Sequence, residues 1–242
     1  MLFPERRLAM LPPFPDGNVG SFGEVLSRQE DGEGGGMSSY LYVLSAVNPV
    51  SMVHVYTLRD SVWSMLASAT QQLPRRRSDI KPVLVNDKIY MAACRRKIIV
   101  LDLTVSTFSI IHLPQRVEYG RADTMFSRAD DHYSSINLVQ AKELQIRIWR
   151  LMGDNWLLVD TICLHDMCAN LRISDCTTVR VRQVGDNVEF VFIEMGRSVL
   201  YLDIRCRTLR KVYEMPNHDR SWGCSIYPLK MIWPPTFPAR ED

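Results

Sequence analysis

The sequence has few cysteines, little net charge and no long hydrophobic run. Its 242 residues include six cysteines without regular spacing (Cys94, Cys163, Cys168, Cys176, Cys206 and Cys224), whereas small secreted scaffolds have dense, patterned cysteines. We therefore expect reduced thiols in an intracellular protein of the cytoplasm or nucleus.

Lys and Arg number 29 against 27 Asp and Glu, and nucleic-acid-binding domains usually have a clustered basic excess. No nucleic-acid partner is expected.

Membrane-spanning segments and helices also have little support in the sequence. Glu5, Arg6 and Arg7 interrupt the segment where a signal peptide would need an apolar core. No segment approaches the 18 continuous apolar residues of a transmembrane helix, so no membrane partner is expected. The i, i+3, i+4 rhythm of an amphipathic helix is rare, and Leu164 to Leu171 is the exception that could form a short helix or turn.

Catalytic motifs are equally scarce. The sequence has no G-x-S-x-G elbow, no Walker loop and no H-E-x-x-H, so familiar nucleophilic, nucleotide-binding and zinc-protease sites have no starting motif. Asp130, Asp131 and His132 could supply a general acid or base. They stand in a polar run that is more typical of a solvated loop. We therefore predict no catalytic residue, no cofactor and no enzymatic activity.

One cluster contains side chains that can bind zinc. Cys163, His165 and Cys168 form C-x-H-x-x-C, with Cys176 eight residues later. Sulfur and imidazole ligands at close spacing can hold zinc, but this spacing matches no common zinc module, and Cys is often buried without a metal. We therefore predict that no metal binds and that the segment packs between two modules.

A glycine-containing segment, Gly20 to Val25, resembles the later part of the glycine-rich loop of protein kinases. The first glycine of that pattern is replaced by Asn18, and no HRD or DFG triplet follows. We interpret the segment as an ordinary loop and the polar stretch Gln29 to Gly36 as a flexible surface loop. Three basic runs are interpreted as solvated turns: Arg75 to Arg77, Arg95 to Lys97, and Arg205 to Lys211.

What the sequence does contain is a repeat. Four nine-residue stretches align without gaps: Val55 to Trp63, Val100 to Phe108, Ile148 to Trp156 and Tyr201 to Leu209. Each has apolar residues at its first, second and fourth positions, then polar or turn-forming residues, then a large apolar residue. This pattern predicts a strand, a turn and a strand. The final residues, Trp63, Phe108, Trp156 and Leu209, are predicted to be equivalent anchors at the start of each outermost strand.

The spacing of the repeat predicts an all-β fold, because modules of 40 to 50 residues with four antiparallel strands are typical of β-propeller blades. We expect one domain over residues 1–242, a partial or small propeller of about four to five blades. The predicted blades are residues 16–70, 78–116, 121–167 and 176–216, with a remnant of an upstream blade at 1–15 and a closing strand at 222–233. Ser225 to Trp233 is expected to pack near the N-terminal strand and complete a fifth, hybrid blade.

Four segments of these modules carry a resemblance to a known family: Tyr40 to Trp63, Lys81 to Pro114, Gln145 to Asp166 and Val188 to Tyr213. The sequence resembles the β-propeller, with kelch-like repeats, that follows the F-box in F-box proteins of plants, especially grasses. In that family the F-box binds the adaptor of a cullin-based ubiquitin ligase, and the propeller selects proteins for ubiquitination.

The resemblance implies a protein-binding module whose partner is a protein of unknown identity. Glu5 to Pro15 resembles the exit of an earlier blade, so we expect a truncated domain without its F-box and no binding to the ligase adaptor. Two alternatives stay open. The propeller could be an enzyme acting on a small molecule or glycan, or a structural scaffold without a regulated partner.

Overall fold

The computed structural model describes residues 22–29, 37–47, 50–59, 62–71, 82–94, 96–118, 123–129, 136–171, 173 and 178–215. Within these ranges the chain forms sixteen strands, one α-helix and one 3-10 turn. The strands make four sheets of four antiparallel strands each, with neighbours in chain order. The predicted all-β fold of four-stranded antiparallel modules is confirmed.

The first two sheets follow one another directly along the chain. The first contains β1 (Phe22–Gln29), β2 (Met37–Val47), β3 (Val50–Arg59) and β4 (Val62–Gln71). The second contains β5 (Val83–Val85), β6 (Lys88–Cys94), β7 (Lys97–Asp102) and β8 (Thr107–His112).

The third and fourth sheets are separated by the α-helix. The third contains β9 (Thr124–Arg128), β10 (Ile136–Lys142), β11 (Gln145–Met152) and β12 (Asn155–Cys163). The fourth contains β13 (Val179–Val184), β14 (Phe190–Met195), β15 (Ser198–Asp203) and β16 (Thr208–Glu214). Helix α1 (His165–Asn170) connects the two, where the sequence predicted a helix or turn, and η1 (Asp186–Val188) connects β13 to β14.

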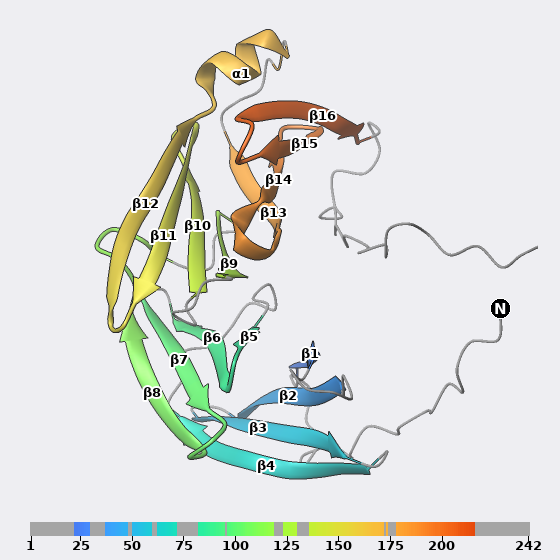
Figure 1. Cartoon of the computed structure of the whole chain (residues 1–242), viewed down its shortest axis with the longest axis vertical. Coiled ribbons are helices and arrows are strands. Elements are labelled where there is room, and N and C mark those ends of the chain that lie inside the picture. Colours follow the sequence, from blue (N-terminus) through green and yellow to red (C-terminus); the bar gives the residue numbers. More distant parts are fainter. Residues whose placement is uncertain are drawn as a thin grey trace, which may run out of the picture.

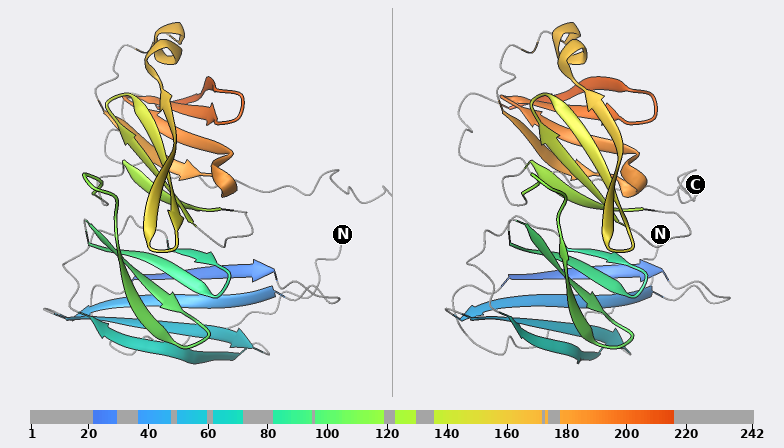
Figure 2. Two further views of the ribbon diagram at one scale, coloured as in Figure 1. Left: turned by 60° about the vertical axis from the view of Figure 1, so that its left-hand side comes forward. Right: turned by 90° about the vertical axis from the view of Figure 1, so that its left-hand side faces the viewer.

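The four sheets stand side by side in an arc, with the first strand of each on the inside and the fourth on the outside (Figure 1). Along the inside, β1 contacts β5, β5 contacts β9 and β9 contacts β13. The sheets are stacked face to face like blades around an axis (Figure 2). Among the described strands, those of the first and fourth sheets form the two ends of the arc.

The alternation of side chains along each strand creates the hydrophobic cores between sheets. In β7, Ile99 and Leu101 join the core shared with the first sheet, whereas Ile98 and Val100 join the core shared with the third. Successive residues of a strand point to opposite faces, so one strand supplies two cores. A third core lies between the third and fourth sheets. We call the face toward the preceding sheet the near face, and the other the far face.

Some sequence expectations need correction, and others lie outside the described residues. The interpretation of Gly20 to Val25 as a loop is wrong from Phe22 onward, because Phe22–Gln29 pairs with β2 as strand β1. Gly23 is part of this strand and lies opposite Val43 of β2. Strand β4 continues to Gln71, one residue past the predicted blade. Residues 1–15 and 222–233, and with them the predicted hybrid blade, lie outside the described ranges. Within the described ranges, no helix is long and apolar enough to cross a membrane.

Candidate interaction surface

The four predicted anchors lie at the same place in the four sheets. Each is the second residue of the fourth strand and pairs with a leucine of the third strand: Trp63 with Leu58, Phe108 with Leu101, Trp156 with Leu151, and Leu209 with Leu202. Their side chains lie on the near face. Phe108, Trp156 and Leu209 each pack into the core shared with the preceding sheet, so they join neighbouring blades.

Two polar contacts also connect neighbouring sheets near the outer strands. The indole Nε1 of Trp156 donates to the carbonyl oxygen of His112 at 2.8 Å, joining the start of β12 to the end of β8. Between the next two sheets, the Arg207 guanidinium pairs with Asp160 of β12 at 2.7 Å. The outer strands of sheets two, three and four are therefore held in fixed relative positions, which a recognition surface spanning them requires.

Strand β12 exposes three successive aliphatic side chains on this outer surface. Leu157, Leu158 and Val159 are 56%, 43% and 41% exposed. The register shifts here: Ile148 pairs with Asp160 and Trp149 with Leu158, leaving Val159 unpaired as a β-bulge. A bulge interrupts the alternation and re-aims neighbouring side chains. We call Leu157, Leu158 and Val159 the outer belt.

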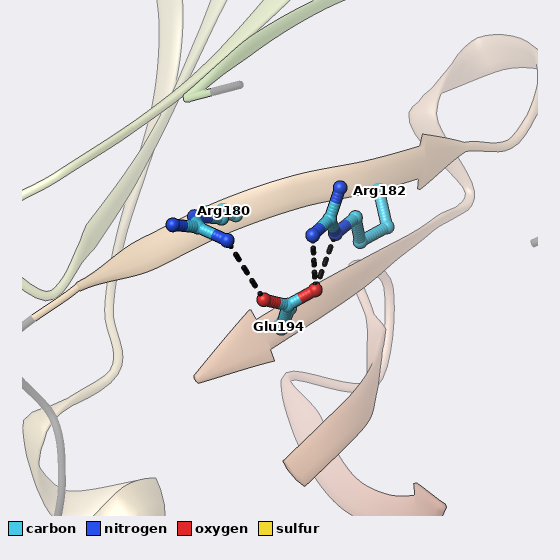
Figure 3. Close-up of polar contacts among 3 residues, drawn as sticks. All are labelled: Arg180, Arg182 and Glu194. Atoms are coloured by element: carbon cyan, nitrogen blue, oxygen red, sulfur yellow. Dashed lines mark hydrogen bonds and ion pairs between the residues drawn. The ribbon is translucent and has the colours of Figure 1, made fainter. Parts of the chain in front are cut away.

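The far face of the fourth sheet carries a different kind of cluster. Glu194 of β14 is nearly buried, and its two carboxylate oxygens accept from two arginines of β13 (Figure 3). Arg180 Nη1 lies 3.2 Å from Oε1, and the Arg182 guanidinium contacts Oε2. Two guanidinium groups compensate one carboxylate, so the buried charge is paired as burial requires, and the half-exposed Arg180 leaves the cluster with an excess positive charge.

Three aromatic rings lie on the same face of the fourth sheet as Glu194. Phe190 stacks on Tyr201 with ring centroids 5.7 Å apart, and Phe192 meets both rings edge-on at 5.6 and 5.5 Å. Aromatic pairs in such arrangements contribute beyond their buried area. Because this face belongs to the last described sheet, its aromatic and charged groups do not pack on a following sheet of the described chain.

The described residues of the C-x-H-x-x-C segment, for which the sequence predicted no bound metal, differ in their exposure. Cys163 and His165 are exposed, whereas Cys168 is buried with its thiol 3.7 Å from the sulfur of Met195. Cys176 lies outside the described residues. In the described ranges no three His, Cys, Asp or Glu side chains are arranged to hold a metal, and Cys163 and Cys206 are free thiols.

The remaining sequence candidates are only partly described. Asp130, Asp131 and His132 lie outside the described residues, as do Arg75 to Arg77. The run Arg205 to Lys211 was predicted to be a turn; Arg205 and Arg207 do lie in one, but Arg210 and Lys211 belong to strand β16. That part of the interpretation is wrong because hydrogen bonds to β15 continue the ladder from Thr208 onward.

The ionisable groups with shifted pKa values stabilise turns and strand ends. The Thr104 hydroxyl, followed by its backbone N–H, lowers the pKa of Asp102 by hydrogen bonding to its carboxylate. The Lys211 ammonium lowers the pKa of Glu214 by hydrogen bonding and charge. Burial raises the pKa of Tyr90, and the nearby Asp102 charge raises it further. These shifts are explained by local structure and point to no acid–base pair.

The comparison with protein families gives the context of this surface. A family model described as "F-box protein AT5G49610-like, beta-propeller" matches residues 1–237. The chain belongs to this family. The four stacked sheets are therefore blades of a β-propeller, and the resemblance inferred from the sequence modules is confirmed. No curated protein matches the sequence.

Among the solved structures that are similar to the chain is the crystal structure of a protein from Lactobacillus plantarum, with 7% sequence identity and a TM-score of 0.41, and the match covers 76% of this chain and 55% of that one. The chain thus spans just over half the length of that protein.

Sequence reasoning missed the outer belt. The signal was present, since Leu157, Leu158 and Val159 are three successive apolar residues in a strand whose neighbours alternate. Alternation alone would bury every second side chain of a half-buried strand, and the exposed run results from a bulge that periodicity does not predict.

Proposed function

We propose that this propeller is a protein-binding module that holds its partner on the outer belt. The single observation that carries the proposal is the run Leu157 to Val159, exposed on a strand whose position is fixed by the Trp156 and Asp160 contacts. Exposed aliphatic side chains on a rigid surface are typical of protein-binding sites. We propose that this chain acts inside the cell and binds a protein partner, without catalysis and without a cofactor, a metal or nucleic acid.

The family supports a more specific role. Its description names an F-box protein, and we propose that the partner is a protein presented for ubiquitination. On this proposal the propeller provides recognition, and the transfer of ubiquitin is carried out by other components. The partner surface should be apolar at its centre, because the belt offers aliphatic side chains, and polar at its edge, where Asp160 and Arg207 lie.

The test compares two variants of the whole chain by proximity labelling in cells of its source organism. The double variant Leu157→Asp/Leu158→Asp places charges in the belt, and Val105→Asp, in an exposed turn of the second sheet, is the matched control. We expect the belt variant to lose labelling of its partners by tenfold or more, as removal of a central apolar contact does. Val105→Asp should label the same proteins as the wild type.

The ubiquitination role has a separate readout. The proteins that the belt variant no longer labels should become more abundant when that variant replaces the wild type. Inhibition of the proteasome in wild-type cells should raise the abundance of the same proteins. If both variants label the same proteins equally, the outer belt is not the binding surface. If labelling is lost but abundance does not change, the module binds proteins that are not degraded.

A further inference from the structure

The outer hairpin of the fourth sheet differs from the other three in its charge. Residues 204–212 contain no Asp or Glu and four basic residues, all of them exposed: Arg205, Arg207, Arg210 and Lys211. In the equivalent stretches of the other sheets, residues 58–66 have one basic and one acidic residue, residues 103–111 have no charged residue, and residues 151–159 have a single acidic one. We call residues 204–212 the basic segment.

Only part of this charge is compensated within the described chain. The Arg207 guanidinium pairs with Asp160 at 2.7 Å, and the Lys211 ammonium pairs with Glu214 of its own strand. None of the described Asp or Glu side chains pairs with Arg205 or Arg210. Exposed guanidinium groups form strong, directional hydrogen bonds with carboxylates, and arginine clusters recognise acidic motifs.

The basic segment lies beside the outer belt. Arg207 reaches Asp160, which directly follows Val159 of the belt. Helix α1, which follows β12 in the chain, contacts β16, and the two elements lie next to each other in Figure 1. The belt and the basic segment therefore form adjoining parts of one outer surface, and the ion pair lies between them.

The apolar part of this surface continues onto the fourth sheet. Val212 has no partner in the pairing of β15 with β16, which makes it a β-bulge. It is the third residue after the anchor Leu209, just as Val159 is the third after the anchor Trp156. Val212 is 51% exposed. A bulge at the same place in neighbouring sheets thus exposes one aliphatic side chain on each, and the basic segment ends with one of them.

This combination of side chains favours a peptide over a nucleic acid. A phosphate backbone would pair with the arginines but would leave the aliphatic side chains of the belt uncovered. Proteins that bind single strands also interleave aromatic residues with the basic ones to stack the bases, and the basic segment has no aromatic residue. A peptide that has both carboxylates and large apolar side chains matches both parts of the surface.

We propose that the partner binds through an acidic segment that spans the third and fourth sheets. Its large apolar side chains contact the outer belt and Val212, and its carboxylates pair with Arg205 and Arg210. The inference rests on the proposed function, because it uses the same belt. It adds the chemical class of the bound segment, which the belt alone does not determine.

The experiment is a selection of phage-displayed random peptides on the purified full chain. The wild type should enrich peptides that combine Asp or Glu with large apolar residues. Arg205→Glu/Arg210→Glu should instead enrich peptides with Lys or Arg. Arg59→Glu/Lys97→Glu is the matched control, because it changes the net charge equally at exposed residues of the first two sheets, and it should enrich the same peptides as the wild type.

Fluorescence anisotropy of one peptide enriched by the wild type measures each part of the contact. Arg205→Glu/Arg210→Glu should weaken its binding about tenfold, and this variant should prefer the same peptide with its acidic residues replaced by Lys. Val212→Ser should weaken binding about threefold. Val105→Ser, at an equally exposed valine of the second sheet, should leave it unchanged.

The same measurements separate the failure of this inference from that of the proposed function. Peptides that lose binding in Leu157→Asp/Leu158→Asp but show no preference for acidic residues would overturn the inference and leave the proposed function standing. Peptides that bind this belt variant as tightly as the wild type would contradict both. A selection that enriches no peptide would also overturn the inference.

A final competition decides between the two classes of anionic ligand. A single-stranded DNA oligonucleotide should displace the enriched peptide weakly. Displacement at a lower concentration than an unlabelled copy of the peptide requires, lost in Arg205→Glu/Arg210→Glu, would show that the basic segment binds nucleic acid and would overturn the proposal. Circular dichroism of each variant establishes that it is folded.

Discussion

The second and third sheets have the same plan but use the same nine residues differently. Val100 to Phe108 and Ile148 to Trp156 align without gaps, and each ends in a near-face anchor. In the second sheet Asp102 pairs with Thr107, leaving a four-residue turn. In the third, Met152 pairs with Asn155, leaving two residues. The third sheet therefore has longer outer strands: β7 and β8 have six residues each, whereas β11 and β12 have eight and nine.

The two turns are stabilised by different chemistry. In the second sheet the Asp102 carboxylate accepts from the backbone N–H and hydroxyl of Thr104, at 3.0 and 2.6 Å, and Ser106 has a φ of 52°. In the third sheet Gly153 has a φ of 60°. Asp side chains commonly bond to the backbone two residues on, and Gly adopts positive φ without steric cost. One turn thus depends on a side chain and the other on a missing side chain.

The difference explains why the belt lies where it does. A longer outer strand exposes more unpaired backbone, and a bulge is one way to prevent edge-to-edge pairing. Strand β12 has such a bulge at Val159, whereas the shorter β8 pairs with β7 without interruption. The longer hairpin of the third sheet therefore provides the strand length and the bulge that together expose Leu157 to Val159.

The largest expected difference concerns the anchors. Trp156→Ala removes both the packing of the ring and its hydrogen bond to His112, and should lower the free energy of unfolding by about 3 kcal/mol. Phe108→Ala removes packing alone and should cost about 1 kcal/mol less. Trp156→Phe isolates the hydrogen bond and should cost about 1 kcal/mol. Urea unfolding of the three variants measures these values, and an unaffected Trp156→Phe would show that the His112 contact contributes nothing.

Much of this architecture could be predicted from the sequence because it depends on period. The two-residue alternation of β7 places Ile98 to Leu101 in two cores, and the repeated nonamers position the anchors. The turn lengths could not be predicted from the gapless alignment, because a shift of two residues leaves every side chain on the same face. The same hydrophobic pattern therefore fits a two-residue and a four-residue turn.

The parts that sequence reasoning missed depend on contacts between distant residues. The bulge at Val159 is visible only in the pairing of β11 with β12. The buried Glu194 looks like an ordinary exposed strand residue until Arg180 and Arg182 are brought beside it by the β13–β14 pairing. Neither the pairing register nor the burial of a charge is determined by local composition.

A smaller effect, of opposite sign in the two turns, is expected from exchanging glycine. Gly153→Ala places a Cβ at positive φ, where nothing else lies within 4 Å of it, so the cost is backbone strain of about 1 kcal/mol. Ser106→Gly removes the same kind of strain from the second sheet and should be neutral or stabilising, by up to about 1 kcal/mol, less the entropy of glycine in the unfolded chain. Thermal unfolding of both variants shows whether the signs differ.

The smallest expected effect is a pH dependence that only the side-chain-stabilised turn should have. The pKa of Asp102 is lowered from its ordinary value of 3.8, chiefly by the Thr104 hydroxyl. A lowered pKa in the folded state means that the carboxylate contributes to stability above the ordinary value and loses that contribution as the pH falls through the lowered value.

Asp102→Asn keeps an acceptor oxygen but removes the charge. Its midpoint of urea unfolding should therefore lie below that of the wild type at pH 7, and the difference should shrink as the pH falls below about 4. Asp154→Ala, in the two-residue turn, is the control, because no described residue donates a hydrogen bond to that side chain. If the two variants changed alike with pH, the Thr104 bonds would not distinguish the two turns, and the comparison would depend on turn length alone.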